Sequence, residues 1–489
     1  MVFSSIVFLF LFLPPVLGVY YLLHSFAPRF WKHLFLTLCS YVFYGWSNPW
    51  FVWLMLVSTA IDYVCARLMT DGFRSPRGAT LPLLDLGGTR TRGQRAALVA
   101  SLVSNLALLG FFKYFNFGID SWNALALALG AEGLALDTTL GIVLPLGISF
   151  YTFQSMSYTI DVYRGDGRAI RSFPDFACYV SMFPQLVAGP IIRFQEVADQ
   201  IADRTHTVEK FARGVAFVCF GMAKKILLAD TCGQIADFCF NAQQVSAAEA
   251  WTGVLAYAFQ IYYDFSGYSD MAIGFGLMLG FMFAKNFDSP YRSASVGEFW
   301  RRWHLSLSNW LRDYLYIPLG GNRLGTRRTY ANLIVVMLLG GLWHGASWNF
   351  VVWGGLHGAA LALERAWNPS PARTRLGRFL RVAATFVFVL FTWVPFRAPD
   401  LAATRRYWGA MLGLGSADGA TGLVSGAIGN PHLMGSLALA AVVAFFGVQS
   451  WDFTRRLTPV RAALAMALFV VALGMLVATS FHPFIYFIF

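Results

Sequence analysis

The sequence predicts an all-α protein that crosses a membrane many times. Of its 489 residues, 57% are hydrophobic and only 13% are charged, whereas soluble proteins carry about 25% charged residues. Several apolar runs are also long enough to form membrane helices. So few charges cannot cover the surface of a soluble domain, which excludes the soluble, fibrous and disordered classes. The net charge of +12 is explained more simply by basic cytoplasmic loops than by nucleic-acid binding.

The first helix is expected within residues 1–23, which contain no charged side chain. A basic start and a small-residue cleavage site are absent, so we expect a retained span, bent near Pro14 and Pro15. About eleven true spans plus re-entrant pieces are predicted in all. The further candidate spans lie near residues 33–46, 49–66, 96–112, 140–160, 174–192, 211–229, 251–263, 265–283, 331–343, 345–363, 379–396, 434–450 and 462–480.

Two arginine-rich loops predict the orientation. Residues 67–95 contain six arginines and two acids, and residues 364–381 contain five arginines and one acid. Cytoplasmic loops are enriched in arginine and lysine, so both loops should be cytoplasmic, which places the amino terminus outside. Further basic residues flank the second and fifth spans, namely Arg29, Lys32, Arg164, Arg168 and Arg171.

Residues 285–328 have the charge density of a soluble protein, with eight basic and three acidic residues. Ser295 and Glu298 have the spacing of a capping box, which predicts a helix start. From Phe299 to Leu315 the apolar residues fall on one arc of a helix. The pattern predicts one amphipathic helix, interfacial or re-entrant, with His304 at the edge of the apolar arc and facing protein.

Residues 329–363 contain no Asp, Glu, Lys or Arg, yet they include His344 and His357. An ionisable side chain inside an apolar span is costly and is by default functional, although a hydrogen-bonded neutral imidazole is the alternative, favoured for His357. Glycines surround His344, as in Gly340-Gly341-Leu342-Trp343-His344-Gly345. They allow close helix packing and a broken helix that lines a cavity.

Asp264 and Asp270 form a second polar group in an otherwise apolar stretch that continues to Lys285. They are compatible with a proton path, an ion site or helix-cap structure, and the structural interpretation is favoured. The sequence contains no P-loop motif, no Gly-x-Ser-x-Gly elbow and no HExxH motif. The six cysteines form no CxxC pair, and we predict neither a disulfide framework nor a metal site.

These motifs together resemble the membrane-bound O-acyltransferase (MBOAT) superfamily, and within it the membrane subunits of bacterial alginate O-acetylation. The resemblance covers nearly the whole chain. It rests on Phe299 to Ser308 (FWRRWHLSLS), Leu311 to Tyr314 (LRDY), Gly320 to Arg323 (GGNR), Gly341 to Gly345 (GLWHG), Asp264 to Asp270 (DFSGYSD) and the tail Phe484 to Phe489 (FIYFIF).

The resemblance implies one MBOAT domain over residues 1–489, a helical bundle with a central tunnel. Its parts would be N-terminal spans (1–283), a basic amphipathic segment (285–328), histidine-bearing spans (329–363) and C-terminal spans (379–489). His344 matches the characteristic catalytic histidine, and His304 matches its second polar partner. The remaining candidates for donor binding or tunnel lining are Asn309, Arg301, Arg302, Arg312, Arg323, Trp303, Trp343, Asp264 and Asp270.

The resemblance also implies the reaction. We expect acetyl transfer from a cytoplasmic donor, acetyl-coenzyme A, with His344 as general base or as acetyl acceptor. His304 or Asn309 would orient the substrate or stabilise the oxyanion. Arg301, Arg302, Arg312 and Arg323 would hold the phosphates of the donor. The alternative is that they bind lipid head groups or are positive-inside charge. No permanently bound cofactor is expected.

The expected setting is the bacterial inner membrane. No soluble domain in this chain could bind a long polymer, so periplasmic acetyltransferase subunits of the serine-hydrolase-like type are the expected partners. The expected acceptor is an exopolysaccharide, most simply alginate. Two alternatives stay open: acetylation of peptidoglycan or another cell-wall polymer, and a proton-coupled transporter that uses Asp264, Asp270, His304 and His344 as a relay.

Overall fold

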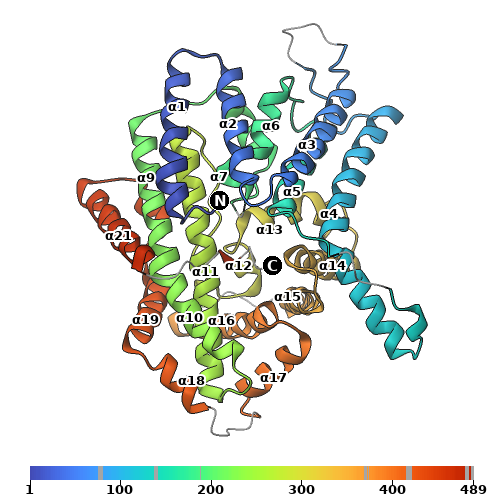
Figure 1. Cartoon of the computed structure of the whole chain (residues 1–489). Coiled ribbons are helices and arrows are strands. Elements are labelled where there is room, and N and C mark those ends of the chain that lie inside the picture. Colours follow the sequence, from blue (N-terminus) through green and yellow to red (C-terminus); the bar gives the residue numbers. More distant parts are fainter. Residues whose placement is uncertain are drawn as a thin grey trace. The chain divides into compact units, whose positions relative to one another are not determined.

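The computed structural model describes residues 1–74, 81–136, 141–187, 189–367, 372, 374–414, 421–478 and 484–485, and these residues form helices and no strand (Figure 1). They divide into two compact units. Unit 1 comprises Met1–Phe211 and Phe275–Ala284, and unit 2 comprises Ala212–Gly274 and Lys285–Phe489. The all-helical fold class is therefore confirmed for the described residues.

Unit 1 holds the N-terminal helices. They are η1 (Val7–Phe12), α1 (Leu13–Phe26), α2 (Arg29–Tyr44), α3 (Trp50–Met69), α4 (Arg92–Ala128), η2 (Glu132–Leu134), α5 (Ile148–Arg164), α6 (Phe173–Ser181), α7 (Phe183–Leu186), α8 (Phe194–Ala202) and the start of α9 (Val208–Ala223).

Unit 2 holds the helices that carry the predicted site. After the rest of α9 they are η3 (Lys224–Ala229), α10 (Asp230–Asn241), α11 (Ala247–Met278, in this unit up to Gly274), η4 (Pro290–Arg292), α12 (Val296–Trp300), α13 (Leu305–Leu311), η5 (Arg312–Tyr316), α14 (Thr326–His344), α15 (Trp348–Trp367), α16 (Arg375–Arg397), α17 (Leu401–Met411), α18 (Thr421–Ile428), α19 (Pro431–Phe446), α20 (Ser450–Phe453) and α21 (Pro459–Ala478).

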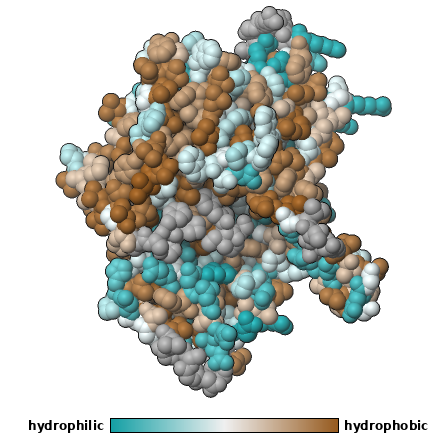
Figure 2. All heavy atoms as spheres, in the orientation of Figure 1, coloured by the Kyte–Doolittle hydropathy of each residue, from teal (hydrophilic) through white to brown (hydrophobic). Residues whose placement is uncertain are grey.

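Five helical stretches in the described part of the chain are long and apolar enough to cross a membrane. They are Val7–Phe26, Trp50–Met69, Arg92–Ala128, Arg375–Arg397 and Pro459–Ala478, and each overlaps a predicted span. The outer faces of α1 and α21 are largely hydrophobic, as expected for lipid contact (Figure 2). The protein is thus a multi-pass membrane protein.

Two sequence predictions about helices are wrong. The spans expected at 251–263 and 265–283 are one helix, α11, so Asp264 and Asp270 lie inside a helix and do not cap one. The amphipathic helix expected from Phe299 to Leu315 is broken after α12. Its start at Ser295 is confirmed, because the Ser295 hydroxyl accepts a hydrogen bond from the Glu298 amide at 3.1 Å.

The basic loops of unit 1 converge on one cavity of about 740 Å³. Arg29 from the start of α2, Leu81 and Leu83 from the 67–95 loop, and Arg168 and Arg171 after α5 all line it. Arg168 donates a hydrogen bond to the Leu81 carbonyl at 3.2 Å. The 67–95 loop, which was predicted to be cytoplasmic, therefore lies at the same end of this unit as the basic residues that flank the second and fifth predicted spans.

Helices α14 and α15 pack closely in unit 2 because glycines face each other. A Cβ atom at Gly341 would overlap the Phe350 carbonyl oxygen, and one at Gly354 would overlap the Met337 carbonyl oxygen. A Cβ at Gly345, in the turn between the helices, would overlap the Phe350 ring. The prediction that glycines near His344 allow close backbone approach is confirmed, and the hairpin turn follows directly after His344.

Candidate functional site

His344 is the last residue of α14 and is only 5% exposed. The chain leaves the helix at Gly345, whose backbone is extended. Three rings surround the imidazole, with centroids 5.0 Å away for Trp343, 5.2 Å for Trp353 and 5.3 Å for Phe396. The helix end therefore presents a histidine to buried aromatic surroundings, as the charge-free span predicted.

His304 lies between α12 and α13 and is fully buried. Its backbone is left-handed, with φ 45° and ψ 56°, a conformation that costs a non-glycine residue about 1–2 kcal/mol. The Leu305 amide donates to the Asn286 carbonyl at 2.9 Å, and the Asp288 amide donates to the Arg302 carbonyl at 2.9 Å. These tertiary hydrogen bonds replace the helical ones, which explains why the predicted continuous helix is broken here.

The structure brings the two predicted histidines together. The ring centroids of His304 and His344 are 6.5 Å apart, and the Trp343 ring lies 6.0 Å from that of His304. Phe265 of α11 packs edge-on against His304 at 4.7 Å. A small polar group between the imidazoles would be within reach of both, which is the arrangement that acid–base or nucleophilic catalysis requires.

Asn286 contacts His304 and was not predicted from the sequence. Its side-chain oxygen lies 3.2 Å from His304 Nδ1, and it accepts hydrogen bonds from the Ser306 amide at 3.2 Å and the Ser306 hydroxyl at 2.9 Å. The Asn286 amide nitrogen donates to the Ser269 hydroxyl at 2.8 Å. No sequence signal distinguishes this asparagine, because its role depends on the break at His304.

The other two candidates in this segment are placed differently. Trp303 is buried in an aromatic cluster, with its ring 5.1 Å from that of Trp393 and 5.1 Å from that of Phe287. Asn309 is half-buried in α13, and within the described part of the chain its side chain forms no hydrogen bond with His304 or His344. Of the two asparagines, Asn286 has the contacts that orient His304.

The predicted arginines do not act as one group. Arg302 is paired with Glu298 at 2.9 Å, and Arg312 is paired with Asp313 at 2.7 Å. Arg323 is exposed on the segment before α14. Arg301 lines a cavity of about 590 Å³. Arg302 and Arg312 are therefore already engaged in ion pairs within the chain.

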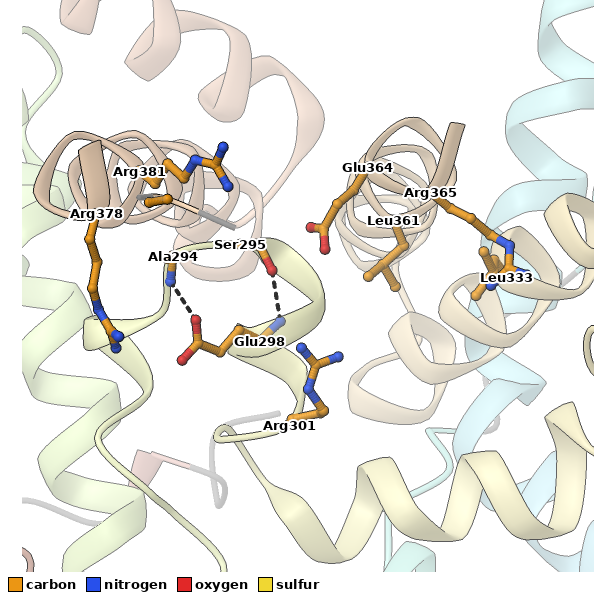
Figure 3. Close-up of a pocket in the computed structure, with 11 residues that line it drawn as sticks. Ala294, Ser295, Glu298, Arg301, Leu333, Leu361, Glu364, Arg365, Arg378 and Arg381 are labelled. Atoms are coloured by element: carbon orange, nitrogen blue, oxygen red, sulfur yellow. Dashed lines mark hydrogen bonds between the residues drawn. The ribbon is translucent and has the colours of Figure 1, made fainter. Parts of the chain in front are cut away.

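The cavity beside Arg301 is rich in arginine. Figure 3 shows Arg365 and Glu364 on α15, Arg378 and Arg381 on α16, and Arg301 beside α12. Both acids of this cavity are engaged within the chain, because Glu364 accepts a hydrogen bond from the Gly297 amide at 3.0 Å and Glu298 accepts one from the Ala294 amide at 2.8 Å. The four arginines therefore form a cationic cavity suited to phosphate groups.

Asp264 and Asp270 are each paired with a lysine of η3. Lys225 lies 2.9 Å from Asp264 and 2.6 Å from Asp230, and Lys224 lies 2.7 Å from Asp270. π-Helical turns such as η3 often occur at functional sites. Here the turn places two consecutive lysines against α11, so both predicted acids are part of a charge network.

The chain's C-terminal segment adjoins this network. The Ile485 amide donates a hydrogen bond to the Asp264 carboxylate at 2.6 Å. The Phe484 ring stacks on Tyr268 at 4.4 Å and lies 6.2 Å from Phe265, the residue that packs on His304. The predicted aromatic tail thus contributes to the wall behind His304, and its remaining residues lie outside the described part of the chain.

His357 of α15 has the structural role that was favoured for it, that of a hydrogen-bonded imidazole. Its Nδ1 accepts a hydrogen bond from the Trp300 indole at 3.3 Å, and its Nε2 lies 3.1 Å from the Thr392 hydroxyl. Both ring nitrogens are therefore engaged in packing α15 against α12 and α16. No group of three or more potential metal ligands occurs among the described residues.

Comparison with known proteins extends the resemblance. Residues 167–399 match the model of the membrane-bound O-acyltransferase family. The chain is 44% identical to the probable alginate O-acetylase AlgI of Pseudomonas putida over 510 residues, which covers 100% of both chains. It is 49% identical to the probable alginate O-acetylase AlgI of Azotobacter vinelandii, covering 85% of this chain and 79% of that one. It is also 36% identical to the peptidoglycan O-acetyltransferase of Helicobacter pylori, covering 85% and 80%.

Proposed function

This chain belongs to the membrane-bound O-acyltransferase family and is an O-acyltransferase, and from that premise we propose that it transfers acetyl groups for O-acetylation of an exopolysaccharide, alginate or a related uronic-acid polymer. The observation that carries the proposal is the buried pair of His304 and His344, 6.5 Å apart, in a chain that is similar over its full length to alginate O-acetylases. Enzyme chemistry is favoured over the transporter alternative by the family.

The proposed chemistry takes place at His344. Acetyl-coenzyme A and a hydroxyl acceptor give an acetyl ester and free coenzyme A. Either the imidazole of His344 removes the acceptor's proton as the oxygen attacks the thioester carbonyl, or it accepts the acetyl group and passes it on. In both cases the thiolate leaves and takes up the proton. His304 would orient the acceptor hydroxyl from the other side, through a hydrogen bond to its imidazole.

The arginine cavity supports a cytoplasmic donor. It is lined by Leu333 of α14 and by Arg301, Arg365, Arg378 and Arg381. Leu333 is eleven residues from His344 along α14, which corresponds to about 16 Å of helix. An extended pantetheine arm spans a comparable length, so donor phosphates held by the arginines would allow the thioester to approach His344. Lipid phosphates remain the competing occupants.

The proposal includes the membrane setting. About eleven spans with a central tunnel in a single domain, in the bacterial inner membrane, would let a cytoplasmic donor and an outer acceptor meet at His344. The described chain has no nucleophilic serine elbow that could finish the transfer onto a polymer. Periplasmic acetyltransferase subunits of the serine-hydrolase type are therefore the proposed partners.

A second candidate acceptor is peptidoglycan. The similarity to the peptidoglycan O-acetyltransferase of Helicobacter pylori favours it. The histidine chemistry is the same for both acceptors, because each presents a sugar hydroxyl. The similarity to alginate O-acetylases is higher and covers the full chain, so the exopolysaccharide is the first choice.

The two acceptors are separated by deleting the gene and analysing both polymers. Proton NMR of the secreted exopolysaccharide should show loss of O-acetyl esters while polymer synthesis continues. Complementation with the wild-type chain should restore the esters, and complementation with His344→Ala should not. Unchanged exopolysaccharide esters would refute the first choice, and loss of acetyl groups from peptidoglycan would establish the second.

A further inference from the structure

We propose that Asn286 is a positioning residue that fixes His304 as the Nδ1–H tautomer and so leaves the Nε2 lone pair for the reaction. The proposal rests on the proposed function of His304. Asn286 is 1% exposed and lies on the segment between α11 and η4. Its side chain and its backbone both contact the His304 region, which no other described asparagine does.

The orientation of the Asn286 side-chain amide is determined by a backbone donor. The Ser306 N–H group can only donate, and the atom that faces it at 3.2 Å is therefore the Asn286 oxygen. The amide nitrogen then faces the Ser269 hydroxyl at 2.8 Å, where it has an acceptor. A flipped amide would place an N–H group against the Ser306 N–H group, so the assignment follows from the contacts.

This orientation determines the tautomer of His304. The same Asn286 oxygen lies 3.2 Å from His304 Nδ1, and an amide oxygen only accepts hydrogen bonds. The Ser306 hydroxyl also lies 3.3 Å from Nδ1, but it donates its one proton to the Asn286 oxygen, so towards Nδ1 it too is an acceptor. His304 Nδ1 must therefore carry the proton. In a neutral imidazole the other nitrogen, Nε2, is then an acceptor.

His304 Nε2 is poised for a ligand. It is buried, and among the described residues no group forms a hydrogen bond with it. Buried polar atoms in native proteins almost always have a partner, so such an atom calls for an explanation. The nearest explanation is a substrate proton: once His344 carries the acetyl group, an acceptor hydroxyl between the two imidazoles would donate to Nε2, and His304 would take up its proton as the oxygen attacks.

Asn286 also holds the backbone of the histidine in place. Its carbonyl accepts the Leu305 amide at 2.9 Å, directly after the left-handed residue His304. Strained backbone persists only where its surroundings over-determine it. One asparagine thus stabilises the unusual backbone with its main chain and sets the ring's protonation with its side chain, so side-chain variants separate the two roles.

The test compares Asn286→Leu with Asn286→Asp in the purified full-length protein, with acetyl transfer from labelled acetyl-coenzyme A as the readout. Leucine keeps the size and the backbone carbonyl but removes the acceptor oxygen, whereas aspartate retains it. Asn286→Leu should lower kcat by about 100-fold or more with little change in KM, because the positioned base is lost. Asn286→Asp should retain at least about tenfold more activity than Asn286→Leu.

Two further variants make the test specific. Ser269→Ala removes the hydrogen bond that the Asn286 amide nitrogen donates, and it leaves the Asn286 oxygen in place. It should therefore change kcat little. In a His304→Ala background, Asn286→Leu should cause no further loss, because Asn286 acts through His304. Equal activity of Asn286→Leu and Asn286→Asp, or an additive further loss, would overturn the inference.

A spectroscopic measurement reads the tautomer directly. In protein with ¹⁵N-labelled histidine, the His304 signals are those that disappear in His304→Gln. They should report a protonated Nδ1 and a bare Nε2, and a protonated Nε2 would overturn the inference. Failure of the proposed function is distinguishable, because it would appear as full activity of His304→Ala, whereas full activity of Asn286→Leu beside an inactive His304→Ala refutes only the role of Asn286.

Discussion

His304 and His344 are forty residues apart in the sequence, yet their ring centroids lie 6.5 Å apart and both side chains are buried. Each histidine sits at the end of a helix: His344 ends α14 and His304 precedes α13. Because the chain leaves the helix at such a position, two side chains from different helices can meet there while the helices themselves stay packed. This pairing is the structural basis for the proposed acetyl transfer.

The glycine contact between α14 and α15 predicts a sharp difference between neighbouring residues. Gly354→Ala should lower stability by about 1–3 kcal/mol, because its Cβ would overlap the Met337 carbonyl. Gly355→Ala is the matched control, since its Cβ would lie 3.7 Å from Leu338, an ordinary contact. Thermal unfolding in detergent measures both variants. Equal midpoints would contradict the close packing of the hairpin.

The arginine cavity predicts an effect on donor binding. The double variant Arg365→Gln/Arg378→Gln should raise KM for acetyl-coenzyme A at least about tenfold, since hydrogen bonds to charged groups contribute about 1.5–3 kcal/mol. Its kcat should change little, because the arginines are remote from the chemistry.

Arg323→Gln is the control for charge alone, because Arg323 is exposed and does not line the cavity. It should leave KM near the wild-type value. If KM is unaffected in the double variant but co-purified anionic lipid decreases, the cavity binds lipid head groups and the donor binds elsewhere.

The lysines of η3 predict unequal contributions to stability. Lys225 is 5% exposed and is paired with both Asp230 and Asp264, whereas Lys224 is 15% exposed and is paired with Asp270. Lys225→Met should therefore lower the apparent unfolding temperature more than Lys224→Met, since removing one partner of a buried ion pair costs about 3–5 kcal/mol. Both unfolding temperatures are measured at one scan rate. A lower unfolding temperature for Lys224→Met than for Lys225→Met would refute the larger contribution of the Lys225 ion pairs.

The predicted orientation is tested by cysteine labelling in intact cells. Cysteines introduced at Leu86 and Leu376, which are 73% and 67% exposed, should resist impermeant reagents because both loops are expected to be cytoplasmic. Cys39, the one partly exposed native cysteine, is first replaced by serine. Ser47→Cys, between α2 and α3, is the control that should be labelled from outside. Labelling of Leu86→Cys in sealed cells would reverse the orientation.

Much of the helical layout could be predicted from the sequence. Apolar runs correctly placed all five stretches that can cross a membrane, because in a membrane protein the hydropathy of a segment largely determines its environment. The charge-free span drew attention to His344 and His357, and the resemblance to the family then singled out His344 as the catalytic candidate.

What the sequence could not provide depends on contacts between distant residues. The break at His304 requires hydrogen bonds from Asn286, which local periodicity does not encode. The pairing of Asp264 with Lys225 joins residues 39 positions apart. The sequence alone therefore could not distinguish a structural ion pair from a proton path at Asp264. The sequence analysis used Arg365, Arg378 and Arg381 only to predict that their loop is cytoplasmic. Their convergence with Arg301 in one cavity follows from the packing of α12, α15 and α16, which the sequence does not show.

The most direct test is transfer of labelled acetyl from acetyl-coenzyme A by the purified protein in liposomes, for the wild type, His344→Gln and His357→Gln. His344→Gln should insert and accumulate normally yet lose at least about 100-fold in rate, while His357→Gln, whose parent histidine only bonds Trp300 and Thr392, should retain most activity. Near-wild-type transfer by a normally folded His344→Gln protein would contradict catalysis by His344.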